Sequence, residues 1–327
     1  MGILLIILKI AAVVTVTMLH VAYVVYFERK VIGHMQARLG PMRVGWHGLL
    51  QPIADFVKLF FKEDVIPSGA DKPVFYIAPV ISVIAALASL AVITFWENFA
   101  ISNINIGILY ILALSSVGAY GIIFAGWASN SKYSFLGGLR ASSQVISYEV
   151  AMGLSLVPVM MFAGSANLGD IVRAQAKYPF VANPFLWISF IVFLLAAIAE
   201  TNRAPFDLPE AETELVAGYF TEYSGIRFGL FFIAEYAGMF VMSSFATICF
   251  FGGWYGPQVW IPGLAFLSVV PNIVWFLLKV YSLIFFYFWI RATLPRYRYD
   301  QLMDLGWKIF IPMALANIVI TGIVKLL

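Results

Sequence analysis

The chain has 327 residues, of which 62% are hydrophobic and only 11% are charged, and its formal net charge is +3. A water-soluble fold is excluded, because the mean hydropathy is +0.92 and several apolar runs of about 20 residues match the length that a helix needs to cross a bilayer. Cys249 is the single cysteine, which excludes an internal disulfide and thiolate-bound zinc or iron-sulfur sites.

Eight apolar segments predict an all-α polytopic membrane protein with eight transmembrane helices, because a helix satisfies its own backbone hydrogen bonds in lipid. We place the spans at residues 3–27, 75–96, 105–128, 143–163, 184–200, 228–252, 262–290 and 309–326. No internal repeat, linker or low-complexity tract separates them. Residues 1–327 are therefore predicted to form a single integral membrane domain.

The distribution of Lys and Arg orients these spans. The first, third, fifth and seventh connections hold fifteen of the 20 basic residues, whereas the second, fourth and sixth hold only Arg173 and Lys177. By the positive-inside rule the odd-numbered connections are cytoplasmic and both termini face outward. On the outward side, Trp254, Tyr255 and Trp260 are typical of an interfacial aromatic belt.

The first inward connection, residues 28–72, is too long for a simple turn. Glu28 and Gln36 at the head of the first span do not contribute to topology and predict a polar cavity there, although the neighbouring basic residues are also explained by contacts with lipid phosphates. Further on, GWHGLLQPIADFVKLFFKED has the periodicity of an amphipathic helix. We expect this helix to lie in the membrane surface, either as an anchor or as a gate for a lipid-soluble ligand.

The fifth connection is unusually acidic, because five of the 17 acids of the chain lie between residues 207 and 222. We expect Asp207 to cap a helix that contains Glu210. The remaining acids, Glu212, Glu214 and Glu222, have only Arg203 and Arg227 nearby to pair with. Because apolar residues flank the segment, partial burial is predicted, and crowded like charges favour proton binding near neutral pH.

Within the spans the notable charges are Glu149, Glu235 and Lys279, with Glu200 at the end of a span. Each would cost at least about 2.5 kcal/mol at the bilayer centre if it faced lipid, so each is expected to face the bundle interior or a water-filled path. An ion pair between Glu235 and Lys279 is the structural alternative. His20 is expected to have a hydrogen-bonded structural role.

Several kinds of chemistry are excluded by the sequence. Of the three histidines only His20 lies within a span, so the paired axial ligands of a membrane cytochrome b are missing. Neither GxGxxG nor GxxxxGK[ST] occurs. We expect no catalytic residue, no metal site and no nucleic-acid partner for this chain, and any redox centre must lie on partner proteins.

Two segments resemble a known family. GLLQPIADFVKLFFKE at 48–63 and PFDLPEAETELVAGYFTEYSG at 205–225 are similar to the signature segments of the H subunit, also called subunit 1, of proton-translocating NADH:quinone oxidoreductase, respiratory complex I. ERKVIGHMQARLGP at 28–41 and LPRYRYDQLMDLGWK at 294–308 resemble further motifs of that family. The similarity spans nearly the whole chain.

The resemblance implies roles for particular residues. The quinone tunnel or its mouth would include Glu28, Arg29, Arg38, Asp55, Asp207, Glu210, Arg291, Arg296 and Arg298. A buried proton path toward the antiporter-like subunits would include Glu149, Glu200, Glu212, Glu214, Glu222, Glu235 and Lys279.

The resemblance also implies partners and a location. Quinone would be the substrate, this chain alone would bind no cofactor, and FMN and iron-sulfur clusters would lie on partner subunits. Peripheral quinone-site and iron-sulfur subunits would dock on the cytoplasmic side, and small membrane subunits and antiporter-like subunits would continue the membrane arm. We expect a multi-pass protein of the bacterial inner (plasma) membrane with both termini periplasmic.

Two alternatives remain open from the sequence. One is the homologous membrane subunit of an energy-converting hydrogenase or formate hydrogenlyase, which copurification with a nickel-iron subunit would reveal. The other is a stand-alone secondary transporter, whose intramembrane charges would bind a solute and a coupling ion. Transport by the purified single chain in liposomes would favour the transporter.

Overall fold

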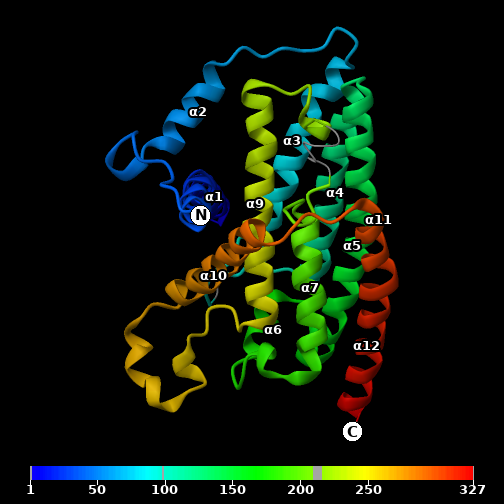
Figure 1. Cartoon of the computed structure of the whole chain (residues 1–327). Helices are drawn as coiled ribbons and strands as arrows, with labels where there is room; N and C mark the ends of the chain where they lie inside the picture. The colour runs from blue at the N-terminus through cyan, green and yellow to red at the C-terminus, as the bar shows by residue number, and fades with distance from the viewer. Residues whose placement is uncertain (1, 98, 209–215, 327) are drawn as a thin grey trace.

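The computed structural model describes residues 2–97, 99–208 and 216–326, and α-helices dominate this part of the chain (Figure 1). The α-helices are α1 (Gly2–Met35), α2 (Gln51–Phe61), α3 (Lys72–Ser89), α4 (Gly107–Ala128), α5 (Lys132–Ala163), α6 (Leu168–Ala174), α7 (Trp187–Glu200), α9 (Gly225–Phe250), α10 (Asn272–Thr293), α11 (Tyr299–Asp304) and α12 (Ile311–Leu326). A π-helical turn, Leu305–Phe310, joins α11 to α12.

Seven helices of the described chain are long and apolar enough to cross a membrane. A shorter apolar helical segment, Pro184–Glu200, contains α7. The all-α polytopic membrane fold predicted from the sequence is therefore confirmed. Two of the predicted boundaries are wrong by about ten residues. The fourth span begins at Lys132 instead of 143, because its first turns are helical but polar. The seventh begins at Asn272 instead of 262, because Pro262–Val269 forms 3-10 turns and Pro271 is extended.

Most of the long helices run side by side. Figure 1 shows α3, α4, α5, α7, α9 and α12 extending up the view, with α5 packed on α4, α7 and α12, and α3 packed on α4 and α9. Helix α1 is seen nearly end-on and crosses this bundle steeply, packed on α9 and α10. The C-terminal part of α1, which carries Glu28, therefore lies against α9 and the end of α10.

The amphipathic segment forms α2 on the outside of α1 and α9. It is shorter than the sequence predicted, because Trp46–Gly48 is a separate 3-10 turn and Pro52 stands in the first turn of the helix. Several of its apolar side chains remain exposed, including Ile53, Phe60 and Phe61. A helix with this exposed apolar face is suited to the membrane surface.

The two ends of the chain contact the same end of the bundle. Lys9 Nζ near the start of α1 donates a hydrogen bond of 3.4 Å to the carbonyl of Ala100, between α3 and α4. Lys325 near the end of α12 donates to the carbonyl of Met161, in the last turn of α5. The expected aromatic belt is wrong at one position, since Trp254 is only 1% exposed and packs in the core.

Helix α7 stops inside the protein. It is 14 residues long, and Figure 1 shows it ending part-way up the bundle, below the first turns of α5 and α9. The non-helical residues that follow, 201–208, are mostly buried. Irregular backbone at this depth is tolerated only where protein or a water-filled cavity satisfies its polar groups. The candidate functional site lies at this break.

Candidate functional site: a buried charge cluster between two cavities

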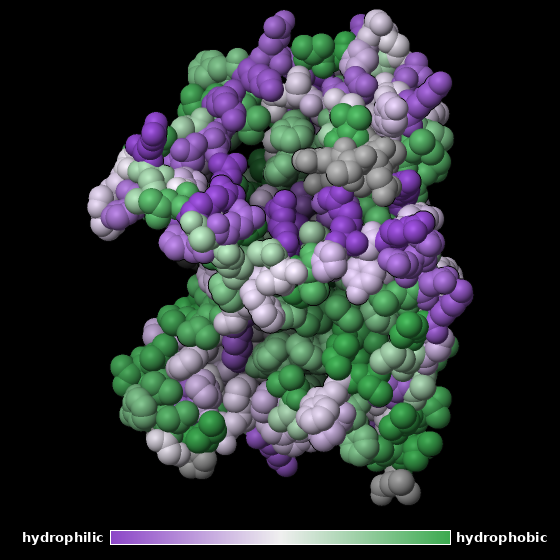
Figure 2. Space-filling model, viewed as in Figure 1, coloured by the Kyte–Doolittle hydropathy of each residue, from purple (hydrophilic) through white to green (hydrophobic). Residues whose placement is uncertain are grey.

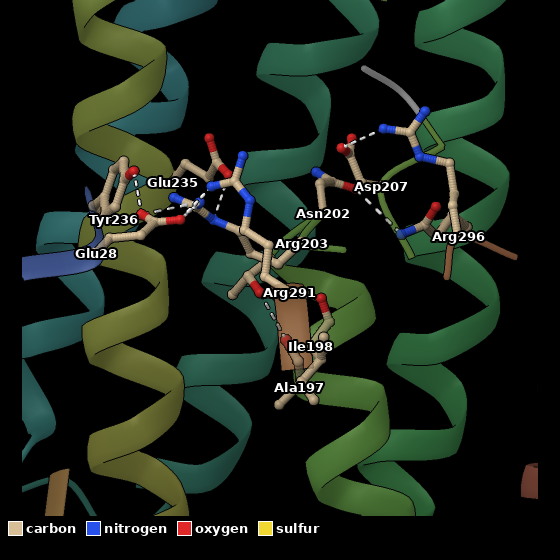
Figure 3. Close-up of polar contacts among 12 residues, drawn as sticks. Glu28, Ala197, Ile198, Asn202, Arg203, Asp207, Glu235, Tyr236, Arg291 and Arg296 are labelled. Carbon is tan, nitrogen blue, oxygen red and sulfur yellow. Dashed lines mark hydrogen bonds and ion pairs between the residues drawn. The ribbon is translucent and has the colours of Figure 1, made fainter. Parts of the chain in front are cut away.

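Arg203 occupies the turn after α7 and is 6% exposed. Its Nη1 lies 3.1 Å from Glu28 Oε1, on α1, and its Nε lies 2.7 Å from Glu235 Oε1, on α9. Burial alone would lower the pKa of Arg203, but the carboxylates of Glu235 and Glu28 and the nearby Tyr236 raise it well above its usual value. Arg203 is therefore a permanent positive charge held between two carboxylates from different helices (Figure 3).

Glu28 is the most heavily bonded carboxylate of the cluster and is only 3% exposed. Besides Arg203, it accepts a hydrogen bond of 2.6 Å from Tyr236 Oη and is paired with the guanidinium of Arg291, near the end of α10. The guanidinium of Arg203 also lies over the ring of Tyr236, 4.2 Å from its centroid. Two arginines thus balance two glutamates, which offsets the cost of burying Glu28, Glu235 and Arg203, while Arg291 stays partly exposed.

A cavity of about 690 Å³ lies on the Glu28 side of this cluster. Its polar lining includes Glu28, Arg29, Gln36, Arg38, Tyr236 and Arg291, and Val25, Leu39 and Phe232 add apolar surface. The polar cavity predicted at the head of the first span is thereby confirmed. One wall is the 36–41 segment, which folds back on α1 so closely that a Cβ on Gly40 would lie 2.9 Å from the carbonyl oxygen of Arg29.

A second, smaller cavity of about 110 Å³ lies on the Glu235 side. Glu200, Glu235, Ser115 and Asn202 line it together with Ala, Leu and Phe side chains. Beyond it, Glu149 accepts hydrogen bonds from Ser116 and, at 3.3 Å, from Ser115, and it lies near enough to Glu200 for the two carboxylates to repel each other. Carboxylates and hydroxyls therefore continue from the charge cluster to α4 and α5.

Further charged groups lie around the cluster. Asp207 is 9% exposed, and Arg296 Nη2 lies 3.0 Å from its carboxylate. Burial raises the pKa of Asp207, while the guanidinium of Arg296 opposes that shift. At the membrane surface, Arg29 pairs with Asp55 at 2.6 Å and so ties α1 to α2. Figure 2 shows a band of hydrophilic residues crossing the molecule above a mostly hydrophobic lower part.

Several predicted site residues lie elsewhere. Arg298 is at the surface, with a 78% exposed side chain 3.5 Å from Asp300. Glu222 is half-buried in the turn before α9. Glu210, Glu212 and Glu214 lie outside the described residues.

The basic residues have other partners than those considered from the sequence, and the alternative of a Glu235–Lys279 ion pair is wrong. Lys279 does not pair with Glu235, because its ammonium group binds the backbone carbonyls of Phe251, Gly253 and Tyr255 at 2.5–3.0 Å. Arg203 pairs with Glu28 and Glu235, whereas the expected partners were the later acids of its own loop. Arg227 lies 3.0 Å from Asp64, in the connection after α2.

Sequence reasoning missed the central role of Arg203, and it missed Tyr236, Ser115 and Ser116 altogether. Arg203 carried a signal, since it is the single basic residue between the end of an apolar span and a run of acids. The hydroxyl groups carried none, because serine is common within helices and only the fold brings Ser115 and Ser116 to Glu149. In the part of the chain that the structure describes, no group of three or more His, Cys, Asp or Glu residues could hold a metal ion.

Comparison with known proteins identifies the family. A family model described as NADH dehydrogenase matches residues 8–322. The chain is 53% identical to the NADH-quinone oxidoreductase H subunit 2 of Geobacter metallireducens, over 97% of this chain and 94% of that protein. It is 52% identical to the NADH-quinone oxidoreductase H subunit of Magnetococcus marinus, over 97% and 90% of the two chains. The chain belongs to the family of NADH-quinone oxidoreductase H subunits.

This membership confirms the resemblance carried by the segments at 48–63 and 205–225. A third relative, the NADH-quinone oxidoreductase H subunit of Rickettsia typhi, is 53% identical over 96% of this chain and 92% of its own. In the present member of the family the first segment contains α2, which Asp55 ties to α1. The second contains Asp207, which follows Arg203 by four residues and Pro205 by two. Asp55 and Asp207, one from each segment, therefore lie near the charge cluster.

Proposed function

We propose that this chain is the membrane subunit of proton-translocating NADH:quinone oxidoreductase that admits quinone and couples its reduction to proton translocation. The larger cavity, between α1, α9 and α10, would take the quinone. The resulting change in electrostatic potential would act on the carboxylates of Glu200 and Glu149. Family membership supports the identity of the complex, and it favours this assignment over a hydrogenase subunit or a stand-alone transporter.

One observation carries the proposal: Arg203 lies between a carboxylate that lines the larger cavity and a carboxylate that lines the smaller one. Reduction of a quinone adds two electrons, and the two protons that make the quinol neutral would come from groups at the larger cavity, so those groups would become more negative until they are reprotonated. A change in the charge or position of Glu28 alters how strongly Glu28 attracts Arg203. The field at Glu235 then changes, and with it the proton affinity of the next carboxylates.

The proposed surroundings rest on membership of the family. The face that carries α2 and the charged connections would be cytoplasmic and would meet the peripheral quinone-site and iron-sulfur subunits, which would hold the FMN and the clusters. The termini would be periplasmic in a bacterial inner membrane. The side of Glu149, between α4 and α5, would face the small membrane subunits and the antiporter-like subunits.

The test is a paired measurement on complexes that contain Glu28→Gln or Glu149→Gln, made in a bacterial strain that lacks its own copy of this subunit. NADH:quinone reductase rate and proton uptake are measured in the same inverted vesicles, with Asp304→Asn as an exposed control. Glu28→Gln should lower the reductase rate. Glu149→Gln should keep most of that rate but lower the number of protons moved per electron. Unchanged rate and unchanged proton movement in both variants would overturn the proposal.

A further inference from the structure

The break after α7 leaves backbone carbonyls without helical partners, and one side chain from α5 binds them. Gln144 is 0% exposed. Its Nε2 donates hydrogen bonds of 2.7 Å to the carbonyl of Ala199 and 2.8 Å to the carbonyl of Phe206, and it lies 3.4 Å from Asn202 Oδ1. The last carbonyls of a helix lack intrahelical partners and must be satisfied by other groups. Gln144 does so from a neighbouring helix.

The residues that Gln144 binds surround the two charges of the turn. Ala199 directly precedes Glu200, and Asn202 directly precedes Arg203. Figure 3 shows Asn202 between Arg203 and Asp207. Asn202 has φ = 50°, a left-handed conformation that the tight turn requires and that few residues other than Asn and Gly adopt readily. Gln144 therefore holds both ends of this tight turn.

We propose that Gln144 is a positioning residue that sets the location of Arg203 relative to Glu200. It contacts neither cavity, since it is absent from the lining of each. It acts through the turn: Arg203 reaches Glu28 and Glu235 only if residues 199–206 keep their path. A loosened turn lets Arg203 move, and charge in the larger cavity then has less effect on the acids beyond Glu235. This inference rests on the proposed coupling function.

The test uses Gln144→Leu, which keeps the approximate volume and removes the amide donors, in the assembled complex in vesicles. The matched control is Gln175→Leu. Gln175 is also 0% exposed, and its amide bonds the carbonyls of Ile171 and Ile248 at the other end of the bundle, far from Arg203 along α9. Both variants lose buried hydrogen bonds, so both are expected to reduce the amount of assembled complex. All rates are therefore taken per FMN bound.

Gln144→Leu should lower the number of protons moved per electron by about threefold, while the quinone reductase rate per FMN stays within about twofold. Gln175→Leu should leave the proton-to-electron ratio at the wild-type value. Gln144→Glu, which in its protonated form keeps one donor, should recover part of the ratio. A wild-type ratio in Gln144→Leu would overturn the inference, as would an equal loss in Gln175→Leu.

Two variants separate this failure from failure of the proposed function. Glu149→Gln and Glu235→Gln alter the acids themselves. If they lower the proton-to-electron ratio and Gln144→Leu does not, the coupling function stands and the positioning role of Gln144 is wrong. If none of the three lowers the ratio, the coupling function itself is wrong. Should Gln144→Leu fail to assemble, Gln144→Glu alone still tests the inference, because it predicts an intermediate ratio.

Discussion

Two cations of this protein, one buried and one half-buried, are neutralised in different ways. Near the middle of α9, Arg203 lies between the carboxylates of Glu28 and Glu235. At the C-terminal end of α9, Lys279 binds three backbone carbonyls and lies 5.1 Å from the ring of Trp260. The two sites are separated by about 24 Å along the helix at 1.5 Å per residue.

The difference lies in what can change charge. Backbone carbonyls do not titrate, so the partners of Lys279 keep their charge, and we infer a structural role for this site at the end of α9 in place of the predicted role on the proton path. The partners of Arg203 are titratable acids, and each of them lines a cavity. A proton or a ligand that reaches either cavity can redistribute the charge of the cluster. We therefore propose that the cation at the end of α9 is a structural cap and that the cation beside its middle is a coupling element.

The largest expected effect comes from removing the shared cation. Arg203→Met leaves Glu28 and Glu235 buried without their common partner, which is expected to cost about 3–5 kcal/mol. We expect little assembled complex, measured as FMN per membrane protein, and recovery of part of it in Arg203→Lys. Normal assembly of Arg203→Met would show that the carboxylates do not depend on this charge.

Lys279→Met should be less damaging, because no buried charge is left unpaired. The carbonyls of Phe251, Gly253 and Tyr255 lose a charged donor, and we expect a loss of about 1.5–3 kcal/mol. Thermal inactivation of the complex measures that loss. The assembled fraction should pump the wild-type number of protons per electron. A lower ratio would show that the Lys279 site, like the Arg203 site, takes part in coupling.

A smaller effect is expected at the wall of the larger cavity. In Gly40→Ala the new methyl group would lie 2.9 Å from the carbonyl oxygen of Arg29, so the 36–41 segment must shift, at about 1–3 kcal/mol. The KM for quinone should change more than kcat, whereas NADH oxidation by ferricyanide should stay normal. A change in ferricyanide reduction would place the effect outside this cavity.

The smallest effect is expected at the surface. Asp304 and Lys308 form a pair one helical turn apart with side chains 61% and 72% exposed. Asp304→Asn should change the stability of the complex by no more than about 0.5 kcal/mol. Its reductase rate and proton movement should equal those of the wild type, which makes it the reference for the buried variants. A large effect would show that this surface is buried against a partner subunit.

The sequence predicted the class of fold because hydrophobicity and helix length follow directly from the thickness of the bilayer. It placed the end of α7 at Glu200 correctly, since the polar residues begin there. It failed at the start of α5, because an amphipathic helix such as Lys132–Ser143 has low hydropathy and is nonetheless helical. Hydropathy identifies the residues that lipid can surround, but it does not identify polar turns that extend a helix beyond them.

The site was predictable in composition but not in pairing. Glu28, Glu200 and Glu235 were singled out because a charge within or next to a span is costly unless it faces the protein interior or water. Their partners depend on the fold, since Arg203 and Glu28 are 175 positions apart in sequence. The alternative of an ion pair between Glu235 and Lys279 failed for the same reason: hydropathy places both residues inside the membrane but does not show that Lys279 lies at the end of α9, far from Glu235.

The proton-to-electron ratio of Glu235→Gln, measured beside that of Lys279→Met in vesicles of matched FMN content, tests the central claim most directly. Glu235 bridges Arg203 to the smaller cavity, so its neutralisation should lower the ratio while quinone is still reduced. Lys279→Met should keep the wild-type ratio. A wild-type ratio in Glu235→Gln would contradict the account.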